Sequence, residues 1–143
     1  MTQRTPVVKV GTSLLRAGDE FLHALAANLS AQRERGTRLV LVTSGAVGLG
    51  CNELGLKQRP QLVEELQAAA AIGQGQLMAR YDAVFRPHGQ TVAQVLLTRS
   101  DLASRRRFIK ASRTLLQLLS WDVLPIINEN DTLATEELRF GDN

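Results

Sequence analysis

Four short hydrophobic runs, each followed at once by small polar residues, dominate the pattern of this chain. Hydrophobic runs of this length between turn residues predict strands that are buried on both faces, as in a parallel sheet. The run 39–42 precedes Thr43-Ser44-Gly45, and we expect it to be the central strand. The other expected strands are 7–10, 91–98 and 123–127.

Amphipathic segments lie between these runs and predict helices. A helix that begins at Gly18 or Asp19 is expected to end at Gly36, because glycine readily takes the left-handed conformation of a C-terminal cap. A shorter helix is expected from Ala46 onward.

Two further helical segments, 62–71 and 76–85, flank Gly73-Gln74-Gly75. The two glycines predict an interruption or a bend between these segments. Ser100 and Asp101 are expected to cap the last helix. The hydrophobic face of that helix would be formed by Phe108, Ile109, Leu115, Leu116 and Leu119.

The order strand, helix, strand, two helices, strand, helix, strand predicts an α/β fold. We expect an α/β/α sandwich around a mainly parallel sheet. The periodicity fades after Asp131, and 132–140 is expected to form a short hairpin. Since the chain ends at Asn143 in the middle of a loop, the domain is expected to be incomplete at its C-terminus.

Composition narrows the function classes. The 143 residues are 44% hydrophobic with a net charge of +3, and only 4% are aromatic, which argues against a base-stacking surface. The basic run 105–107 is expected to be a solvated or subunit-contact surface. The single cysteine, Cys51, excludes an internal disulfide and a multi-cysteine zinc site, and the two histidines, His23 and His88, have no metal-ligand spacing. Without a signal peptide or membrane span, a cytoplasmic protein is expected.

Loops that follow the strands of a parallel sheet meet at one edge, where ligands bind. In this sequence all such loops are small, polar and rich in hydrogen-bond donors or carboxylates, whereas the loops at the opposite edge are typical solvated turns. We therefore expect the functional site at the carboxyl edge, in the loops 11–13, 43–46, 98–101 and 128–131.

The first site candidate is the turn of Ser44, Gly45 and Ala46. A helix that starts at Ala46 would direct its unpaired N–H groups and the positive end of its dipole over this turn, which favours an anion. We expect a substrate carboxylate there. An ordinary strand-to-helix turn without a ligand explains these residues equally well.

The second candidate is Lys9, which stands among three valines near the end of the first strand. A buried ammonium needs an anionic partner, so we expect Lys9 to reach a transferred phosphoryl group and stabilise its charge. Gly11 and Thr12 follow and suit a phosphate-binding nest. The alternative is a lysine that extends into solvent from an edge strand.

The third candidate is Asp131, which follows the fourth strand beside Asn128. Its carboxylate would suit the ammonium group of a ligand. Together with the amides near Ser44, it would hold both ends of a zwitterion. Hydrogen bonding within an Asx turn is the alternative interpretation.

Four sequence blocks resemble those of the amino acid kinase family: Val-Val-Lys-Val-Gly-Thr-Ser at 7–13, Val-Thr-Ser-Gly-Ala at 42–46, Leu-Leu-Thr-Arg at 96–99 and Pro-Ile-Ile-Asn-Glu-Asn-Asp at 125–131. The ending Gly-Asp-Asn resembles a further block. The first block is widespread in the family, whereas Asn-Glu-Asn-Asp with Gly-Asp-Asn is typical of the members that phosphorylate glutamate. The resemblance covers essentially the whole chain, in the same order.

The resemblance implies phosphoryl transfer from ATP, with Mg²⁺, to the side-chain carboxylate of L-glutamate, the first step toward proline. It also implies feedback inhibition by proline and a homo-oligomer. By this likeness Lys9 and Gly11 would contact the nucleotide, while Ser44, Asp131 and Asn143 would bind glutamate.

The family pattern continues beyond Asn143 with a catalytic aspartate and the nucleotide-binding half of the domain. Residues 1–143 are therefore expected to be the N-terminal, substrate-binding part, inactive alone and with an unpaired sheet edge. Other interpretations stay open: a family member that acts on another carboxylate or on carbamate, a non-catalytic regulatory fragment, and a basic nucleic-acid-binding module.

Overall fold

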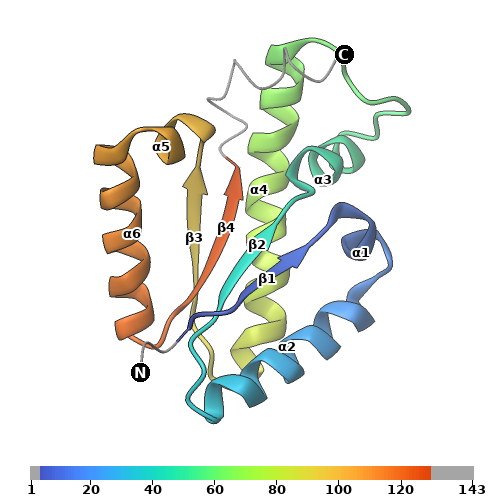
Figure 1. Cartoon of the computed structure of the whole chain (residues 1–143). Helices are drawn as coiled ribbons and strands as arrows, with labels where there is room; N and C mark the ends of the chain where they lie inside the picture. Colours follow the sequence, from blue (N-terminus) through green and yellow to red (C-terminus); the bar gives the residue numbers. More distant parts are fainter. Residues whose placement is uncertain (1–3, 130–143) are drawn as a thin grey trace.

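A computed structural model describes residues 4–129, so the hairpin predicted at 132–140 lies outside the described residues. Within 4–129 the strands β1 (Val7–Val10), β2 (Val40–Thr43), β3 (Val92–Leu97) and β4 (Leu124–Glu129) form one parallel sheet in the order β1-β2-β4-β3 (Figure 1). The remaining elements are α1 (Thr12–Arg16), α2 (Asp19–Glu34), α3 (Ala46–Glu53), α4 (Val63–Phe85), the 3₁₀ helix η1 (Arg86–His88), α5 (Arg99–Ala103) and α6 (Arg105–Ser120).

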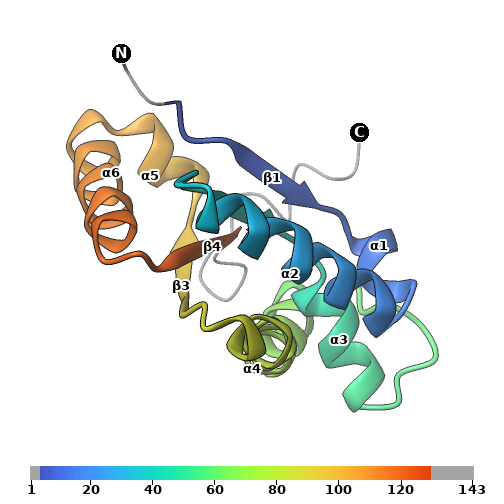
Figure 2. The ribbon, with the colours of Figure 1, turned by 90° about the horizontal axis from the view of Figure 1, so that it is seen from below.

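Helices lie on both sides of the sheet. Seen from below, α2, α3 and α4 are on one side and α5 and α6 on the other (Figure 2). The main core fills the space between the sheet and the pair α2 and α4, because alternate strand residues point there. Its fully buried side chains include Leu22, Leu41, Tyr81, Phe85 and Ile126. The predicted α/β sandwich with a parallel sheet is confirmed for the described residues.

The helix α2 begins and ends close to the residues predicted from the sequence. The helix begins at Asp19 after Gly18, and Gly36 adopts a φ of 85° just beyond the end of the helix. Glycine takes this left-handed conformation without the steric cost that a side chain imposes. The cap predicted from the sequence is therefore confirmed.

The break predicted at Gly73-Gln74-Gly75 is wrong, because α4 runs unbroken from Val63 to Phe85. Gly73 instead lets α3 approach: a Cβ built on it would lie 1.7 Å from the Ala46 carbonyl oxygen. Gly50 of α3 is its counterpart, since a Cβ there would lie 1.7 Å from the Ala69 carbonyl oxygen. Backbone packing of α3 on α4 offsets the low helix propensity of the glycines.

The last predicted helix is in fact two helices with separate caps. Thr98, rather than Ser100, is the N-cap of α5, and Ser104 caps α6. Most of the hydrophobic face predicted for this helix is exposed: Leu119 is buried, but Phe108 is 50% and Leu116 64% exposed. The expectation that this face is covered is therefore wrong for the described residues.

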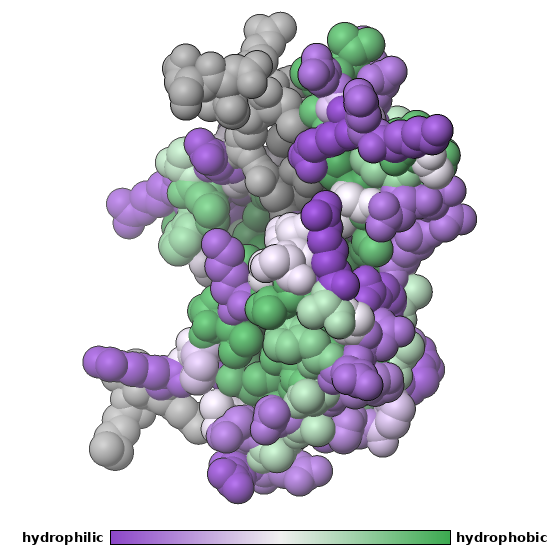
Figure 3. Space-filling view, turned by 90° about the vertical axis from the view of Figure 1, so that its right-hand side faces the viewer, coloured by the Kyte–Doolittle hydropathy of each residue, from purple (hydrophilic) through white to green (hydrophobic). Residues whose placement is uncertain are grey.

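The outer strands of the described sheet are β1 and β3. Val7 on β1 is 64% exposed, and Leu14 of α1 is exposed as well. On the face shown in Figure 3, an apolar area lies below a mainly hydrophilic upper part. No helix within residues 4–129 combines the length and apolarity that crossing a bilayer requires.

Two glycines of α4 give a matched test of this packing. Gly73→Ala should destabilise the protein by more than about 2 kcal/mol, because its methyl group overlaps the α3 backbone. Gly75→Ala has open space around it and should be neutral or stabilising by up to ~1 kcal/mol. Urea unfolding of both variants measures the difference. Equal effects would show that the close contact of α3 and α4 is not as described.

Candidate functional site

The starts of α1, α3 and α5 share one edge of the sheet, since each helix directly follows a parallel strand. This confirms that the loops after β1, β2 and β3 gather at the carboxyl edge. The phosphate nest predicted at 11–13 stays a prediction, but its backbone is a helix start and not a loop. Gly11 is the N-cap of α1, and Thr12 and Ser13 already form the first turn of that five-residue helix.

The start of α3 has an unneutralised dipole as far as residues 4–129 are concerned. Gly45, its N-cap, has a φ of 104°, makes no side-chain cap and is followed by no acidic residue in the first turn. Neither the N-cap nor the first turn therefore offers a side-chain acceptor to the first N–H groups of α3 or an anion to the positive end of the helix dipole. Glycine is also required for space, because a Cβ at this position would lie 3.0 Å from Leu15 Cδ1.

The start of α5, at the same edge, shows the opposite arrangement. The Thr98 side chain accepts a hydrogen bond from the Asp101 N–H, and the Asp101 carboxylate accepts one from the Thr98 N–H at 2.9 Å. The backbone hydrogen bond from Thr98 is the main cause that lowers the pKa of Asp101. Because α5 supplies its own anion, the starts at this edge that stay open to a ligand are those of α1 and α3, since neither has an N-cap side chain or an acid in its first turn. The eight-residue α3 is the longer of the two helices and has the stronger dipole.

Hydrogen bonds hold the Ser44 turn from two sides. The Ser44 hydroxyl lies 3.0 Å from Thr12 Oγ1 of α1. Beneath it, Thr43 Oγ1 lies 2.7 Å from the Tyr81 hydroxyl of α4 and donates to the Ser44 carbonyl at 3.3 Å. Burial is the main cause that raises the pKa of Tyr81. The turn is therefore fixed before any ligand binds.

A pocket of roughly 330 Å³ opens beside this turn, between α1, the end of β2, α3 and β4. It brings together many of the predicted site residues, namely Thr12, Ser44, Gly45, Ala46 and Asn128. Asn128 is 4% exposed, and its amide donates to Gln74 Oε1 at 2.7 Å. The described lining has no acid or histidine, so these residues supply hydrogen-bond donors and positive charge rather than a general base.

Lys9 differs from its prediction. Its side chain is exposed on β1, an outer strand of the described sheet, so the expected burial of its ammonium is wrong. The expected contact of Lys9 with a transferred phosphoryl group stays a prediction. No carboxylate within residues 4–129 forms an ion pair with Lys9. Neither Lys9 nor Gly11 lines the pocket, but Val42, the register partner of Lys9, does. Paired residues of neighbouring strands face the same side, so Lys9 points to the side of the sheet that Val42 faces.

Asp131 and Asn143 lie outside the described residues. The predicted contact between a ligand ammonium and Asp131 therefore stays a prediction. So does the predicted contact of Asn143 with glutamate.

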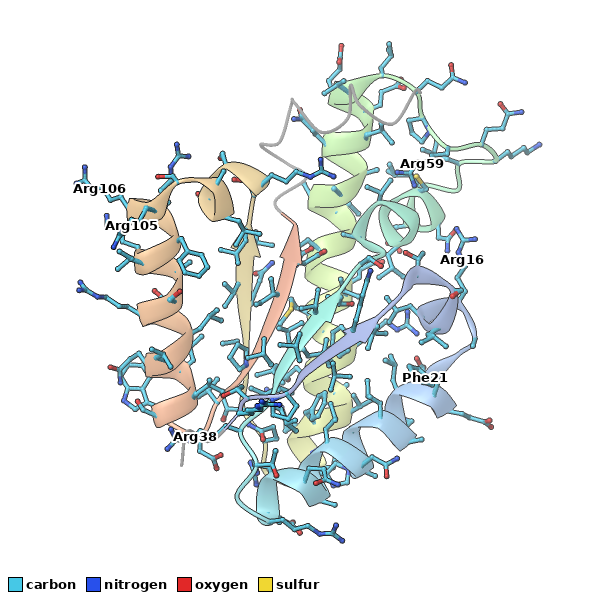
Figure 4. All side chains as sticks on the ribbon, in the orientation of Figure 1. Arg16, Phe21, Arg38, Arg59, Arg105 and Arg106 are labelled. Atoms are coloured by element: carbon cyan, nitrogen blue, oxygen red, sulfur yellow. The ribbon has the colours of Figure 1, made fainter. Side chains whose placement is uncertain are left out.

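The two charged residues of the described pocket lining were not predicted from the sequence. Arg16 of α1 and Arg59 of the loop before α4 both line the pocket (Figure 4). Arg16 lies four residues after Thr12 and so on the same face of α1, a spacing that could have identified it. Arg59 gave no signal, because it is one of several charged residues in a polar loop.

Cys51 has the structural role expected of it. Its side chain is buried in a small cluster with Val47, Leu66, Ala69 and Ala70, between α3 and α4.

Within residues 4–129, no group of three or more His, Cys, Asp or Glu side chains is placed to hold a metal ion.

Comparison with known proteins agrees with this architecture. A sequence model described as the amino acid kinase family matches residues 4–143. The glutamate 5-kinases of Prochlorococcus marinus (strain MIT 9313) and Synechococcus sp. (strain CC9902) are 63% and 62% identical to this chain over 142 and 139 residues. Each match covers 96% of this chain and 39% of the relative, so the chain spans about two fifths of the length of these relatives.

A solved structure shows the same fold. The chain is similar to aspartate kinase from Synechocystis with a TM-score of 0.52, over 87% of this chain and 21% of that one. At 14% sequence identity this likeness concerns the fold alone. It confirms the α/β sandwich expected from the order of strands and helices.

The buried pair of Thr43 and Tyr81 gives a test with a pH signature. Tyr81→Phe keeps the ring but removes the hydroxyl, and should cost about 1 kcal/mol at neutral pH. The pKa of Tyr81 is raised in the folded state above the ordinary tyrosine value of 10.0, so the hydroxyl contributes fully below that pH. Its contribution falls as the pH rises from there toward the folded pKa.

The measurement is the free energy of unfolding of both proteins between pH 7 and pH 11. The difference between them should be constant at first and shrink above about pH 10. A difference that stays constant, or grows, over the alkaline range would contradict the buried hydrogen bond.

Proposed function

Since this chain belongs to the amino acid kinase family, we propose that residues 1–143 form the substrate-binding part of a kinase. The kinase transfers the γ-phosphoryl group of ATP to the side-chain carboxylate of L-glutamate. The observation that carries this proposal is the uncapped start of α3, which meets Ser44, Thr12 and Asn128 in one pocket. The function named for the relatives at 63% and 62% identity agrees with such a pocket.

In the proposed reaction, an oxygen of the glutamate side-chain carboxylate forms a bond to the γ-phosphorus of ATP. The bond from that phosphorus to the oxygen bridging to the β-phosphate breaks, and ADP leaves. The product is L-glutamyl 5-phosphate, an acyl phosphate. An ionised carboxylate carries no proton that must be removed, which agrees with a described pocket lining that has no general base.

The part of this chain in that reaction is to hold the carboxylate substrate. The amides of Ala46 and the residues after it offer N–H donors to one carboxylate. Ser44 adds a hydroxyl whose position is fixed by Thr12. Asp131 and Asn143 complete the proposed contacts to glutamate, with the Asp131 carboxylate receiving the ammonium group.

Lys9 and Gly11 take the nucleotide side of the proposal. An exposed ammonium group that no carboxylate of residues 4–129 pairs with can move to meet incoming phosphates. Charge stabilisation of the transferred group is the main need of phosphoryl transfer. The nucleotide-binding half of the domain, with its catalytic aspartate, would lie in a part of the protein that follows residue 143.

The likeness to this family also implies Mg²⁺ with the ATP. Among residues 4–129, no three His, Cys, Asp or Glu side chains are placed to hold such an ion. Feedback inhibition by proline, a homo-oligomeric assembly and a cytoplasmic location complete the proposed function.

Ser44→Ala tests the carboxylate site. In the natural protein that contains this chain, the glutamate KM should rise about tenfold, because the turn loses both a donor and its bond to Thr12. Trapping of the acyl phosphate with hydroxylamine measures the rate. Ser100→Ala, at the same edge but on α5, is the control and should leave the KM unchanged. No hydroxamate from glutamate and ATP with the wild type would overturn the proposed function itself.

Lys9→Gln tests the phosphoryl side. We expect kcat to fall about a hundredfold while the glutamate KM changes little, since charge develops on the transferred group in the transition state. Lys57→Gln, on the exposed loop before α4, is the matched control. A Lys9 variant that keeps its kcat, or that loses only glutamate affinity, would contradict this role.

A further inference from the structure

Three sources of positive charge meet at the pocket beside α3. The first is the uncapped, dipole-positive start of α3 itself. The second and third are the side chains of Arg16 and Arg59, which line the same pocket. Since the described lining contains no carboxylate, these charges repel one another until an anion enters.

Arg16 is placed directly against α3. Its Nη2 atom lies 3.9 Å from the position that a Cβ on Gly48 would occupy. Gly48 belongs to the first turn of α3, so this guanidinium sits where the helix dipole is unfavourable to a cation. The absence of a side chain at Gly48 leaves the space for it.

Other arginines at comparable places carry a carboxylate partner. Arg80 pairs with Asp19 at 3.0 Å in the neighbouring pocket, which Arg16 lines as well, so the carboxylate of that pocket is already taken by Arg80. Arg107 lies 3.8 Å from Asp101 at the start of α5. Within residues 4–129, neither Arg16 nor Arg59 forms an ion pair.

One anionic group does not use all of these charges. The N–H groups at the start of α3 suffice for a single carboxylate. The two guanidinium groups that line the same pocket can then bind a second carboxylate. A ligand with two carboxylates fits this distribution better than a ligand with one.

We propose that Arg16 and Arg59 bind the second carboxylate of the substrate and so select a dicarboxylate over its mono-amides. The proposal rests on the proposed function, because it assigns specificity residues to the same pocket. The arginines are exposed, so they also attract the anion from solution, and this attraction weakens as salt is added.

The experiment compares Arg16→Gln, Arg59→Gln and the double variant in the natural protein that contains this chain. Each single variant should raise the glutamate KM about tenfold, and the double variant more. Arg106→Gln on α6, far from the pocket in Figure 4, is the control for net charge and should not change the KM.

Two further readouts separate recognition from a structural role. The ratio of kcat/KM for glutamate to that for isoglutamine, which keeps the acceptor carboxylate, should fall in the variants if the arginines bind the α-carboxylate. Glutamine lacks the acceptor carboxylate, so it is measured as a competitive inhibitor; the ratio of its Ki to the glutamate KM should fall instead if the arginines bind the side-chain carboxylate. The rise of the wild-type KM between 50 and 300 mM salt should also be smaller in the double variant.

The outcomes are distinct. Wild-type turnover of glutamate with unchanged variants would overturn the arginine proposal and leave the proposed function intact. Variants that change only the ATP KM would assign the arginines to phosphate and overturn their role in dicarboxylate selection. A wild type that does not use glutamate at all would instead defeat the proposed function.

Discussion

The contact of α3 with α4 constrains everything at the carboxyl edge. The two helices meet backbone to backbone, with Gly50 and Gly73 each facing a carbonyl oxygen of the other helix, at a distance that no side chain would permit. Because α4 packs into the main core through fully buried Leu77, Tyr81 and Phe85, it holds α3 in a fixed place. The start of α3 is therefore presented at the edge of the sheet by a rigid support rather than by a flexible loop.

The position of the α3 start at the carboxyl edge determines the electrostatics of the pocket. At the same edge, α5 neutralises its own start with Asp101, while α3 has neither a side-chain cap nor an acid in its first turn. Leaving helix N–H groups without a side-chain acceptor lowers stability, and such a cost is typical of sites that bind a ligand. Arg16 and Arg59 add charge of the same sign, so the described lining of the pocket favours an anion.

Much of the fold was readable from the sequence, since uninterrupted hydrophobic runs and glycine caps such as Gly36 act locally. The errors arose where distant residues decide. Gly73 looked like a helix breaker because its partner, the backbone of Ala46, is 27 positions away. Lys9 looked buried among valines, but burial depends on the position of β1 at the outside of the sheet, which only the strand order reveals. The Ser44 turn was found because strand, turn and helix are contiguous, whereas Arg59 reaches the pocket from a loop without any periodic signal.

The central claim, that the start of α3 is the carboxylate site, can be tested most directly by NMR titration of the ¹⁵N-labelled protein with L-glutamate. The account predicts that the largest saturable shifts occur at the amides of Ala46, Val47 and Gly48, in the first turn of α3. The amides at the start of α5, which Thr98 and Asp101 already cap, should shift little. Saturable binding of glutamate with its shifts concentrated elsewhere, and none in the first turn of α3, would contradict the account.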